Sequence, residues 1–235
     1  MNTVRVLNTD ITDTTINEVS EMLNNSSGNT VAICNANTLV QCVKNNDINS
    51  VINSFTVASP DGFPVAKAIS KLAKKNIKRV DGYKVFKKTI EEGLKIGTSH
   101  YFFGSSERVV SRMISNLKKE YPAVNISGYT CPPVENVEDL VNTFNKSIGD
   151  LDPDIVWVSL GFPKQEMFID SLLKNSTIQS NFVLLVLLCS DIMQFLNLPS
   201  PSFSSPGTIT HISPPIAFKP LLYMVPAPLP IAALF

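Results

Sequence analysis

The first 180 residues alternate between short apolar runs and stretches in which apolar residues recur every three or four positions. Short apolar runs flanked by polar or turn-forming residues predict strands. They are Val4–Leu7, Thr30–Cys34, Ser54–Ala58, His100–Phe103, Asn125–Gly128 and Asp154–Ser159. The three-and-four spacing predicts helices between them, most clearly over residues 16–23, 109–117 and 140–148. This alternation predicts an α/β fold: a mainly parallel, Rossmann-like sheet with helices on both faces.

The pattern changes near residue 181. From there to the end, the chain has two charged residues, Asp191 and Lys219, and nine of its 16 prolines. Because proline removes a backbone donor and clashes with the preceding turn, neither a regular helix nor a membrane-spanning helix is expected there. We therefore predict an α/β core over residues 1–185 and an irregular or disordered Pro-rich tail over residues 186–235. A tail that touches a membrane is the alternative.

Charge and cysteine content exclude several classes of protein. Basic and acidic residues balance at 20 each, so no positive field favours a nucleic-acid partner. The four cysteines, which form no CxxC pair, are Cys34, Cys42, Cys131 and Cys189. With only two histidines to join them, no metal site is predicted, and free thiols in a reducing cytoplasm are expected. The N-terminus also lacks an apolar export signal, which favours a cytoplasmic location.

The motifs of several common enzyme classes are also missing. The chain has no GxxxxGK[ST] phosphate loop, no GxSxG turn, no HExxH and no DxD pair. These absences disfavour P-loop, serine-hydrolase and metalloprotease functions. No GxGxxG follows the first predicted strand, which disfavours a dehydrogenase.

Parallel sheets bind ligands where their strands end, so the loops after the strands are the places to search. Ser59-Pro60-Asp61-Gly62 follows one predicted strand. A carboxylate there could accept a proton from an attacking hydroxyl, which makes Asp61 a candidate general base. The alternative is that Asp61 only caps a helix from Phe63 to Lys74.

Two further segments offer hydrogen-bonding groups of other kinds. Arg79, in Lys78-Arg79-Val80-Asp81-Gly82, could bind a phosphate or hold a carboxylate, while Asp81 is expected to cap the next helix. Asn35, Asn37 and Thr38 follow the second predicted strand and suit sugar hydroxyls. They could equally form a simple helix cap, with Asn37 as the capping residue.

The last two candidate loops each contain glycine and precede a helix. Gly104 and Ser105 end a strand where backbone donors could hold phosphate. Gly161 is followed by Phe162 and Pro163, then by Lys164, Gln165 and Glu166 in the predicted first turn of a helix. Lys164 offers a charge for phosphate, and Gln165 can donate and accept hydrogen bonds toward a sugar or base. An ordinary helix start is the alternative in both places.

Taken in order, NANT, SPDG, KRVDG, YFFGSSERVV and PDIVWVSLGFPKQEMFI resemble the WecG/TagA/CpsF glycosyltransferase family over about residues 1–185. The resemblance implies inverting transfer of N-acetylmannosamine, or its uronic acid, from a UDP-sugar donor. The implied acceptor is polyprenyl-diphosphate-linked N-acetylglucosamine, for teichoic acid, common antigen or capsule synthesis. It implies no cofactor and no bound metal. It also implies peripheral contact with the inner face of the cell membrane, and it allows a homo-oligomer.

By this resemblance, Asp61 is the general base on the acceptor hydroxyl. The implied substrate-binding residues are Asn35, Asn37, Thr38, Arg79, Gly104, Ser105, Gly161, Lys164, Gln165 and Glu166. Asn35 stands where the family commonly has threonine.

The tail departs from the family pattern. The family usually continues with a Gly-Val-Gly turn and an Arg-rich helical appendage, whereas this chain reads VLLVLLCSDIMQFLNLPSPSFSSPG. We hypothesise a frameshift near residue 186, in the gene or in its sequencing, which resequencing of the locus tests. Without the appendage, a catalytically impaired nucleotide-sugar-binding protein of the same fold is the alternative function.

Overall fold

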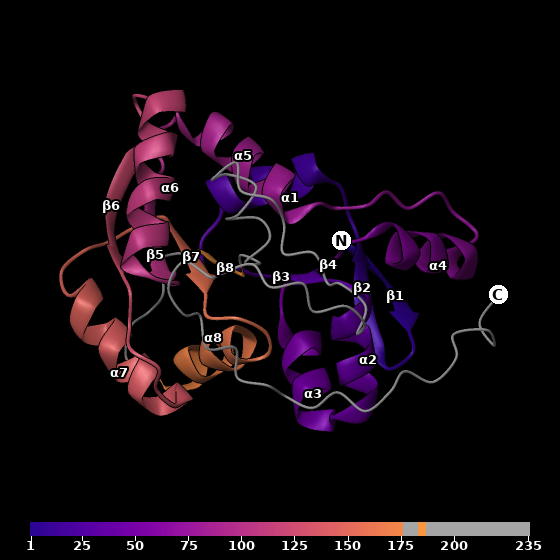
Figure 1. Cartoon of the computed structure of the whole chain (residues 1–235). Coiled ribbons are helices and arrows are strands. Elements are labelled where there is room, and N and C mark those ends of the chain that lie inside the picture. The colour runs from indigo at the N-terminus through magenta and orange to yellow at the C-terminus, as the bar shows by residue number, and fades with distance from the viewer. Residues whose placement is uncertain (176–182, 187–235) are drawn as a thin grey trace, which may run out of the picture. The chain divides into compact units, whose positions relative to one another are not determined.

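The computed structural model describes residues 1–175 and 183–186, all within the first of two units, residues 1–201 (Figure 1). In this part of the chain, a six-stranded sheet has the order β4-β3-β8-β7-β5-β6, and every neighbouring pair is parallel. A separate hairpin joins β1 and β2. The strands are β1 (Asn2–Val6), β2 (Thr9–Asp13), β3 (Thr30–Cys34), β4 (Val57–Pro60), β5 (Ser99–Gly104), β6 (Asn125–Thr130), β7 (Ile155–Ser159) and β8 (Val183–Val186).

Helices connect these strands. They are α1 (Ile16–Asn25), α2 (Ala36–Lys44), α3 (Asn46–Ser54), α4 (Phe63–Ala73), α5 (Gly82–Gly93), α6 (Glu107–Glu120), α7 (Val137–Ile148) and α8 (Lys164–Asn175). The three helices predicted most clearly from apolar spacing are α1, α6 and α7. The predicted α/β fold with a mainly parallel sheet is confirmed.

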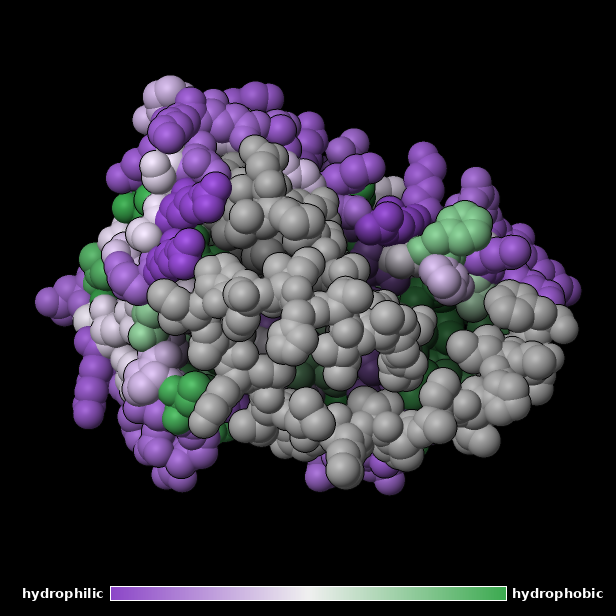
Figure 2. Space-filling model, in the orientation of Figure 1, coloured by the Kyte–Doolittle hydropathy of each residue, from purple (hydrophilic) through white to green (hydrophobic). Residues whose placement is uncertain are grey.

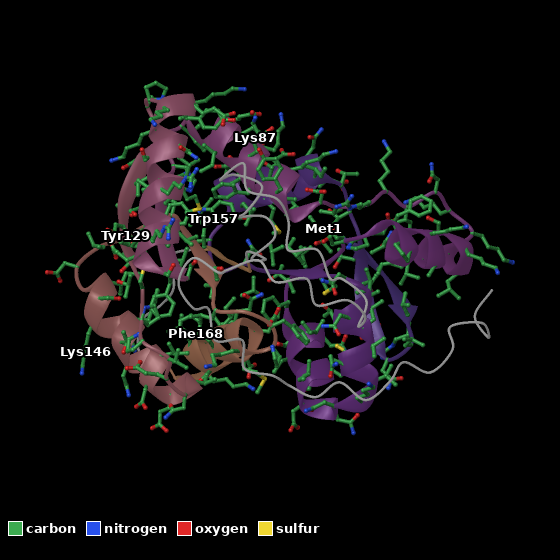
Figure 3. All side chains as sticks on the ribbon, in the orientation of Figure 1. Met1, Lys87, Tyr129, Lys146, Trp157 and Phe168 are labelled. Carbon is green, nitrogen blue, oxygen red and sulfur yellow. The ribbon has the colours of Figure 1, made fainter. Side chains whose placement is uncertain are left out.

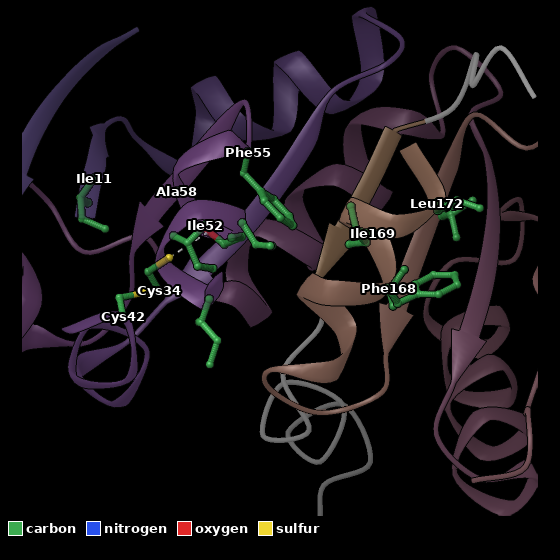
Figure 4. Close-up of a cluster of buried hydrophobic side chains, with 14 of the residues drawn as sticks. Ile11, Cys34, Cys42, Ile52, Phe55, Ala58, Phe168, Ile169 and Leu172 are labelled. Atoms are coloured by element: carbon green, nitrogen blue, oxygen red, sulfur yellow. Dashed lines mark hydrogen bonds between the residues drawn. The ribbon is translucent and has the colours of Figure 1, made fainter. Parts of the chain in front are cut away.

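The two faces of the sheet are covered by different helices, because successive strand side chains point to opposite faces. Ala32 and Cys34 of β3 belong to a buried cluster with residues of α2, α3, α7 and α8. Val31 and Ile33 of the same strand belong to a second cluster with residues of α1, α5 and α6. Figure 1 shows these two helical layers on either side of the strands, and Figure 4 shows part of the first cluster, with Cys34, Ile52 and Phe168.

Aromatic rings pack both layers against the central strands. Trp157 of β7 meets Phe86 of α5 edge-on, with ring centroids 4.7 Å apart. On the other face, Phe103 of β5 stacks on Phe168 of α8 with centroids 4.9 Å apart. Figure 3 labels Trp157 and Phe168, which belong to the two different clusters. The sheet is therefore packed on both faces.

Several predicted strands differ from the structure in their bounds, and two of these differences change the fold locally. The run Val4–Leu7 was expected in the parallel sheet, but Asn2–Val6 pairs antiparallel with Thr9–Asp13, a strand that its polar sequence did not predict. The buried polar residues of β2 find hydrogen-bond partners. The Thr12 hydroxyl, for example, accepts a hydrogen bond from the Ala58 N–H at 3.0 Å. The strand predicted from Ser54 begins instead at Val57, because Asn46–Ser54 forms helix α3.

The predicted boundary between core and tail falls at the end of β8. Residues 187–235, including the Pro-rich tail and Cys189, lie outside the described residues. None of the helices in the described part of the chain is long and apolar enough to cross a membrane.

Candidate active site

The sheet brings the candidate residues together in two groups along its carboxyl edge. Cys34 at the end of β3 pairs with Pro60 at the end of β4, and the Asp61 N–H donates to the Cys34 carbonyl at 2.9 Å. The loops that start at Asn35 and Asp61 are therefore neighbours.

The second group forms where β5 and β7 end. Gly104 pairs with Ser159, and the Ser105 N–H donates to the Ser159 carbonyl at 2.7 Å. Gly161 follows two residues after Ser159, so the glycine loops after β5 and β7 are neighbours too. Strand β8 lies between β3 and β7 and separates the two groups. The ends of β4 and β5, the outer members of the two groups, are four strand spacings or about 19 Å apart, whereas the ends of β3 and β7 are two spacings or about 10 Å apart.

Asp61 does not cap a helix, so the alternative interpretation of this residue is wrong. Gly62 occupies the capping position of α4, with a φ of 85°, and α4 has no side-chain cap. The Asp61 carboxylate instead accepts the Gly62 N–H at 2.7 Å and the Arg79 Nε at 3.1 Å, both on Oδ1. No hydrogen bond from the described residues reaches Oδ2, and 14% of the side chain is exposed. One oxygen is thus anchored while the other can serve as a base.

Arg79 bridges two carboxylates rather than one. Its Nε donates to Asp61, and its terminal nitrogen forms an ion pair with Asp81 Oδ2. Asp81 also caps α5 as predicted, because its Oδ1 accepts the Lys84 N–H at 3.1 Å. The backbone next to Arg79 is fixed as well, since the Val80 N–H donates to the Pro60 carbonyl at 2.8 Å. Of the two roles that the sequence offered for Arg79, binding a phosphate or holding a carboxylate, the structure shows the second. The sequence did not indicate that Arg79 bridges Asp61 and Asp81 and so links the end of β4 to the start of α5.

Asn35 caps α2, whereas Asn37 was predicted to do so. The Asn35 Oδ1 accepts the Thr38 N–H at 3.1 Å and the Thr38 hydroxyl at 3.4 Å. Asn37 is exposed on the first turn of the helix, and Thr38 is buried. The capping bonds use both Asn35 Oδ1 and the Thr38 hydroxyl, so Asn37 is the most open of the three toward a ligand.

The turn after β5 needs glycine. Gly104 has a φ of 114°, and a Cβ atom built there would lie 2.2 Å from the Ser159 carbonyl oxygen. Ser105 also has a positive φ, 60°. Helix α6 then starts at Glu107 with no hydrogen bond from the Ser106 side chain to its first turn. This leaves backbone donors at the helix start that could meet an anion.

The loop after β7 is held by its own side chains. The Gln165 Oε1 accepts the Gly161 N–H at 3.1 Å, and the Gln165 Nε2 donates to the Glu166 Oε1 at 3.3 Å. Lys164 donates from Nζ to the Glu135 carbonyl at 3.0 Å. The polar ends of Gln165 and Lys164 are therefore engaged within the protein, where a role toward substrate was predicted for both.

Glu166 is a buried carboxyl, with 2% of its surface exposed. Its Oε2 has no hydrogen-bond partner among the described residues. Burial raises the pKa of Glu166 to about 7, against the opposing effects of its own backbone N–H and of Gln165. Burial and the nearby Glu166 also raise the pKa of the Cys34 thiol well above its ordinary value. Cys34 and Cys42 are free and buried, as predicted.

The sequence of the chain, compared with known families, matches the Glycosyl transferase WecG/TagA/CpsF family over residues 4–186. The chain belongs to this family. The match includes both groups of candidate residues at the carboxyl edge.

Two curated relatives of this WecG/TagA/CpsF family member are bacterial enzymes. A protein of Bacillus subtilis (strain 168) is 31% identical over 143 residues, which cover 60% of this chain and 54% of the relative. A protein of Bacillus spizizenii is 25% identical over 147 residues, which cover 63% of this chain and 56% of the relative. Both are named N-acetylglucosaminyldiphosphoundecaprenol N-acetyl-beta-D-mannosaminyltransferase. The chain spans just over half of the length of these relatives.

In this family member, the two groups at the sheet edge differ in chemistry. The group after β3 and β4 holds a partly exposed carboxylate, whereas the group after β5 and β7 holds glycine turns and the start of α6. In the part of the chain that the structure describes, no three His, Cys, Asp or Glu side chains are placed to hold a metal ion. The arrangement offers a candidate base in the first group and backbone donors for an anion in the second.

Proposed function

We propose that this chain is an inverting glycosyltransferase. It transfers N-acetylmannosamine, or its uronic acid, from a UDP-sugar to a polyprenyl-diphosphate-linked N-acetylglucosamine. The observation that supports this most is the anchored Asp61 carboxylate at the carboxyl edge, with Oδ1 held by Gly62 and Arg79. The printed names of the two relatives support the choice of donor sugar and lipid-linked acceptor.

Asp61 acts as the general base. As the acceptor hydroxyl oxygen forms its bond to the anomeric carbon, the bond from that carbon to the UDP oxygen breaks. The hydroxyl proton passes to Asp61 Oδ2, and UDP leaves as an anion. A sugar hydroxyl is a weak nucleophile, so a positioned carboxylate accelerates the step by about a hundredfold to ten-thousandfold.

The glycine turns after β5 and β7 hold the nucleotide side of the donor. Gly104 and Ser105 allow the backbone to approach the nucleoside end of the donor closely, and the start of α6 offers N–H donors to its polar groups. Arg79 keeps the Asp61 carboxylate oriented. Gln165 and Glu166 keep the Gly161 loop in shape. Asn37 is the residue of the α2 start that we expect to contact a sugar hydroxyl.

The test is a transfer assay with UDP-N-acetylmannosamine and a water-soluble short-chain lipid acceptor. Asp61→Asn removes the base but keeps the size of the side chain, so the rate of UDP release should fall by about a hundredfold or more. Asp152→Asn is the matched control, because Asp152 is exposed and lies outside both groups. Equal rates in the wild type and Asp61→Asn would overturn Asp61 as the base. A panel of other UDP-sugars identifies the donor.

A second candidate is a nucleotide-sugar-binding protein without turnover. It is favoured because both cationic side chains at the site already have partners within the protein, which leaves them less able to stabilise a leaving phosphate. Arg79 pairs with two carboxylates, and Lys164 donates to the Glu135 carbonyl. Titration of the protein with UDP-N-acetylmannosamine separates the two. Binding without UDP release, in the presence of acceptor, supports the binding protein and contradicts the enzyme.

A further inference from the structure

Helix α4 and the segment after it are unusually basic. Residues 62–80 contain no acidic side chain, and their lysines are Lys67, Lys71, Lys74, Lys75 and Lys78. The chain as a whole has 20 basic and 20 acidic residues. Positive charge is therefore concentrated on this one segment of a neutral protein.

The outer face of α4 combines this charge with exposed apolar side chains. Val65, Ala66 and Ile69 face the core, whereas Phe63 is 71% exposed and Leu72 is 59% exposed. Residues four apart lie in one row on a helix, so the exposed residues form two neighbouring rows. One row is Phe63, Lys67 and Lys71, and the other is Pro64, Ala68 and Leu72.

Most of these lysines are available to an external partner. Lys75 pairs with Asp13 at 2.5 Å. Lys67, Lys71, Lys74 and Lys78 are exposed and form no ion pair with the residues that the structure describes. Figure 2 shows hydrophobic atoms beside hydrophilic ones in the region where Figure 1 places α4. A helix face with lysines around bulky apolar residues is typical of helices that lie in the interface of an anionic bilayer.

We propose that the outer face of α4 is a lipid-binding surface, and that its partner is a bilayer containing anionic phospholipids. Phe63 and Leu72 enter the boundary between headgroups and acyl chains, and the four unpaired lysines contact the headgroups. The proposal rests on the proposed function for its biological setting. Phe63 lies two residues after Asp61, so a membrane bound at α4 would bring the base next to the surface from which a lipid diphosphate projects.

The experiment is co-sedimentation of the purified full chain with two kinds of vesicle. One is phosphatidylcholine alone, and the other is an equal mixture of phosphatidylcholine and phosphatidylglycerol. The wild type should bind the anionic vesicles more tightly, and added salt should weaken that binding. A lysine beside an anionic surface strengthens binding about fivefold. Replacing Lys67, Lys71, Lys74 and Lys78 by glutamine should therefore weaken binding by about tenfold or more. Leu72→Ser should weaken it too.

The matched control replaces four exposed lysines elsewhere, Lys44, Lys95, Lys118 and Lys119, by glutamine. It has the same net charge as the α4 variant, so it should bind vesicles within about twofold of the wild type. Equal losses in both sets of variants would overturn the α4 surface, as would a wild type that binds heparin or acidic proteins but not anionic vesicles. Vesicle binding that depends on residues outside the segment 62–80 would overturn it as well.

The assay also separates this proposal from the proposed function. The α4 lysine variant and Leu72→Ser should retain transfer to a water-soluble short-chain acceptor and lose it to a long-chain acceptor in anionic vesicles. A chain that releases UDP from no donor but still binds vesicles through α4 contradicts the enzyme and leaves the lipid surface intact. A chain that transfers sugar but binds no vesicles contradicts only the lipid surface.

Discussion

Arg79 is the residue on which the geometry of Asp61 depends most directly. It reaches Asp61 through Nε and Asp81 through a terminal nitrogen, and these donors lie at fixed positions in one rigid plane. A lysine, whose single ammonium group ends a flexible side chain, cannot place donors toward both carboxylates in this way. Arg79, for which the sequence suggested either a phosphate or a carboxylate partner, is therefore placed to position the candidate base.

We predict that Arg79→Ala lowers the rate of UDP release by about tenfold to a hundredfold, because Asp61 loses its anchor and a nearby positive charge. Arg79→Lys should recover only part of the rate, since lysine cannot bridge both carboxylates. Steady-state transfer kinetics on both variants check this. Full activity in Arg79→Ala would contradict a positioning role.

Glu166 predicts a dependence of stability on pH. Its ordinary pKa of 4.5 rises to about 7 in the folded chain, so between these values the folded state holds a proton that the unfolded state has lost. The contribution of Glu166 to the free energy of unfolding therefore falls as pH rises through this range, and its loss is complete above pH 7. The Glu166→Gln side chain keeps an oxygen that can accept the hydrogen bond from Gln165 Nε2, and it cannot ionise. This variant should be more stable than the wild type above neutral pH, by on the order of 3 kcal/mol. Urea unfolding of both proteins at several pH values measures this; parallel profiles would refute it.

Among the elements, those with strong apolar spacing were predictable and those set by distant contacts were not. Strand β3 was predicted with its bounds intact because all five residues are buried and β-forming or small. Strand β2 was missed because its threonines are buried against partners far away in sequence, such as Ala58. The candidate site was predictable to the same extent. The spacing of apolar residues located the strands, and with them the loops that contain Asp61 and Gly161. It did not reveal which side chains bond to one another, because that depends on which strands become neighbours.

The turn after β5 makes a prediction at the scale of strand packing. Gly104→Ala places a methyl group against the Ser159 carbonyl at a φ of 114°, so β5 and β7 must separate. We expect a loss of about 3 kcal/mol or more in the free energy of unfolding. Gly97→Ala is the control, because Gly97 has a φ of 78° but no atom near its Cβ position. It should cost only about 1–2 kcal/mol. Fluorescence of Trp157, the one tryptophan of the chain, reports unfolding in urea; equal losses in both variants would contradict steric contact as the cause.

For the whole molecule, stability at mildly acidic pH is the sum of opposing contributions. Burial lowers the pKa of His100 from 6.5 to about 4, and its Nδ1 accepts the Trp157 indole N–H at 3.2 Å. Between these pH values the unfolded chain holds the extra proton, so the His100 contribution to stability is lost as pH falls. Glu166 contributes in the opposite direction over an overlapping range.

We predict that the wild type has a shallow profile of unfolding free energy between about pH 4.5 and 6.5, where the two contributions offset each other. In Glu166→Gln, stability should fall steadily with acid over this range. His100→Asn keeps an acceptor for Trp157 and should show the reverse slope, and the double variant should be flat again. Denaturant midpoints across pH measure all four proteins. A double variant as steep as either single variant would show that other groups dominate.

Strand β8 occupies the centre of the sheet although it is the last strand described along the chain. Thr30 pairs with Leu184, and Ile155 pairs with Val183, so β8 joins the β3–β4 half to the β5–β7 half. A ribosome that synthesises this protein delivers both halves long before the strand that unites them. The nascent chain must therefore wait with two unpaired inner edges, which are surfaces that chaperones and aggregation partners recognise. A delay in synthesis before β8 has left the ribosome should thus lower the yield of folded protein.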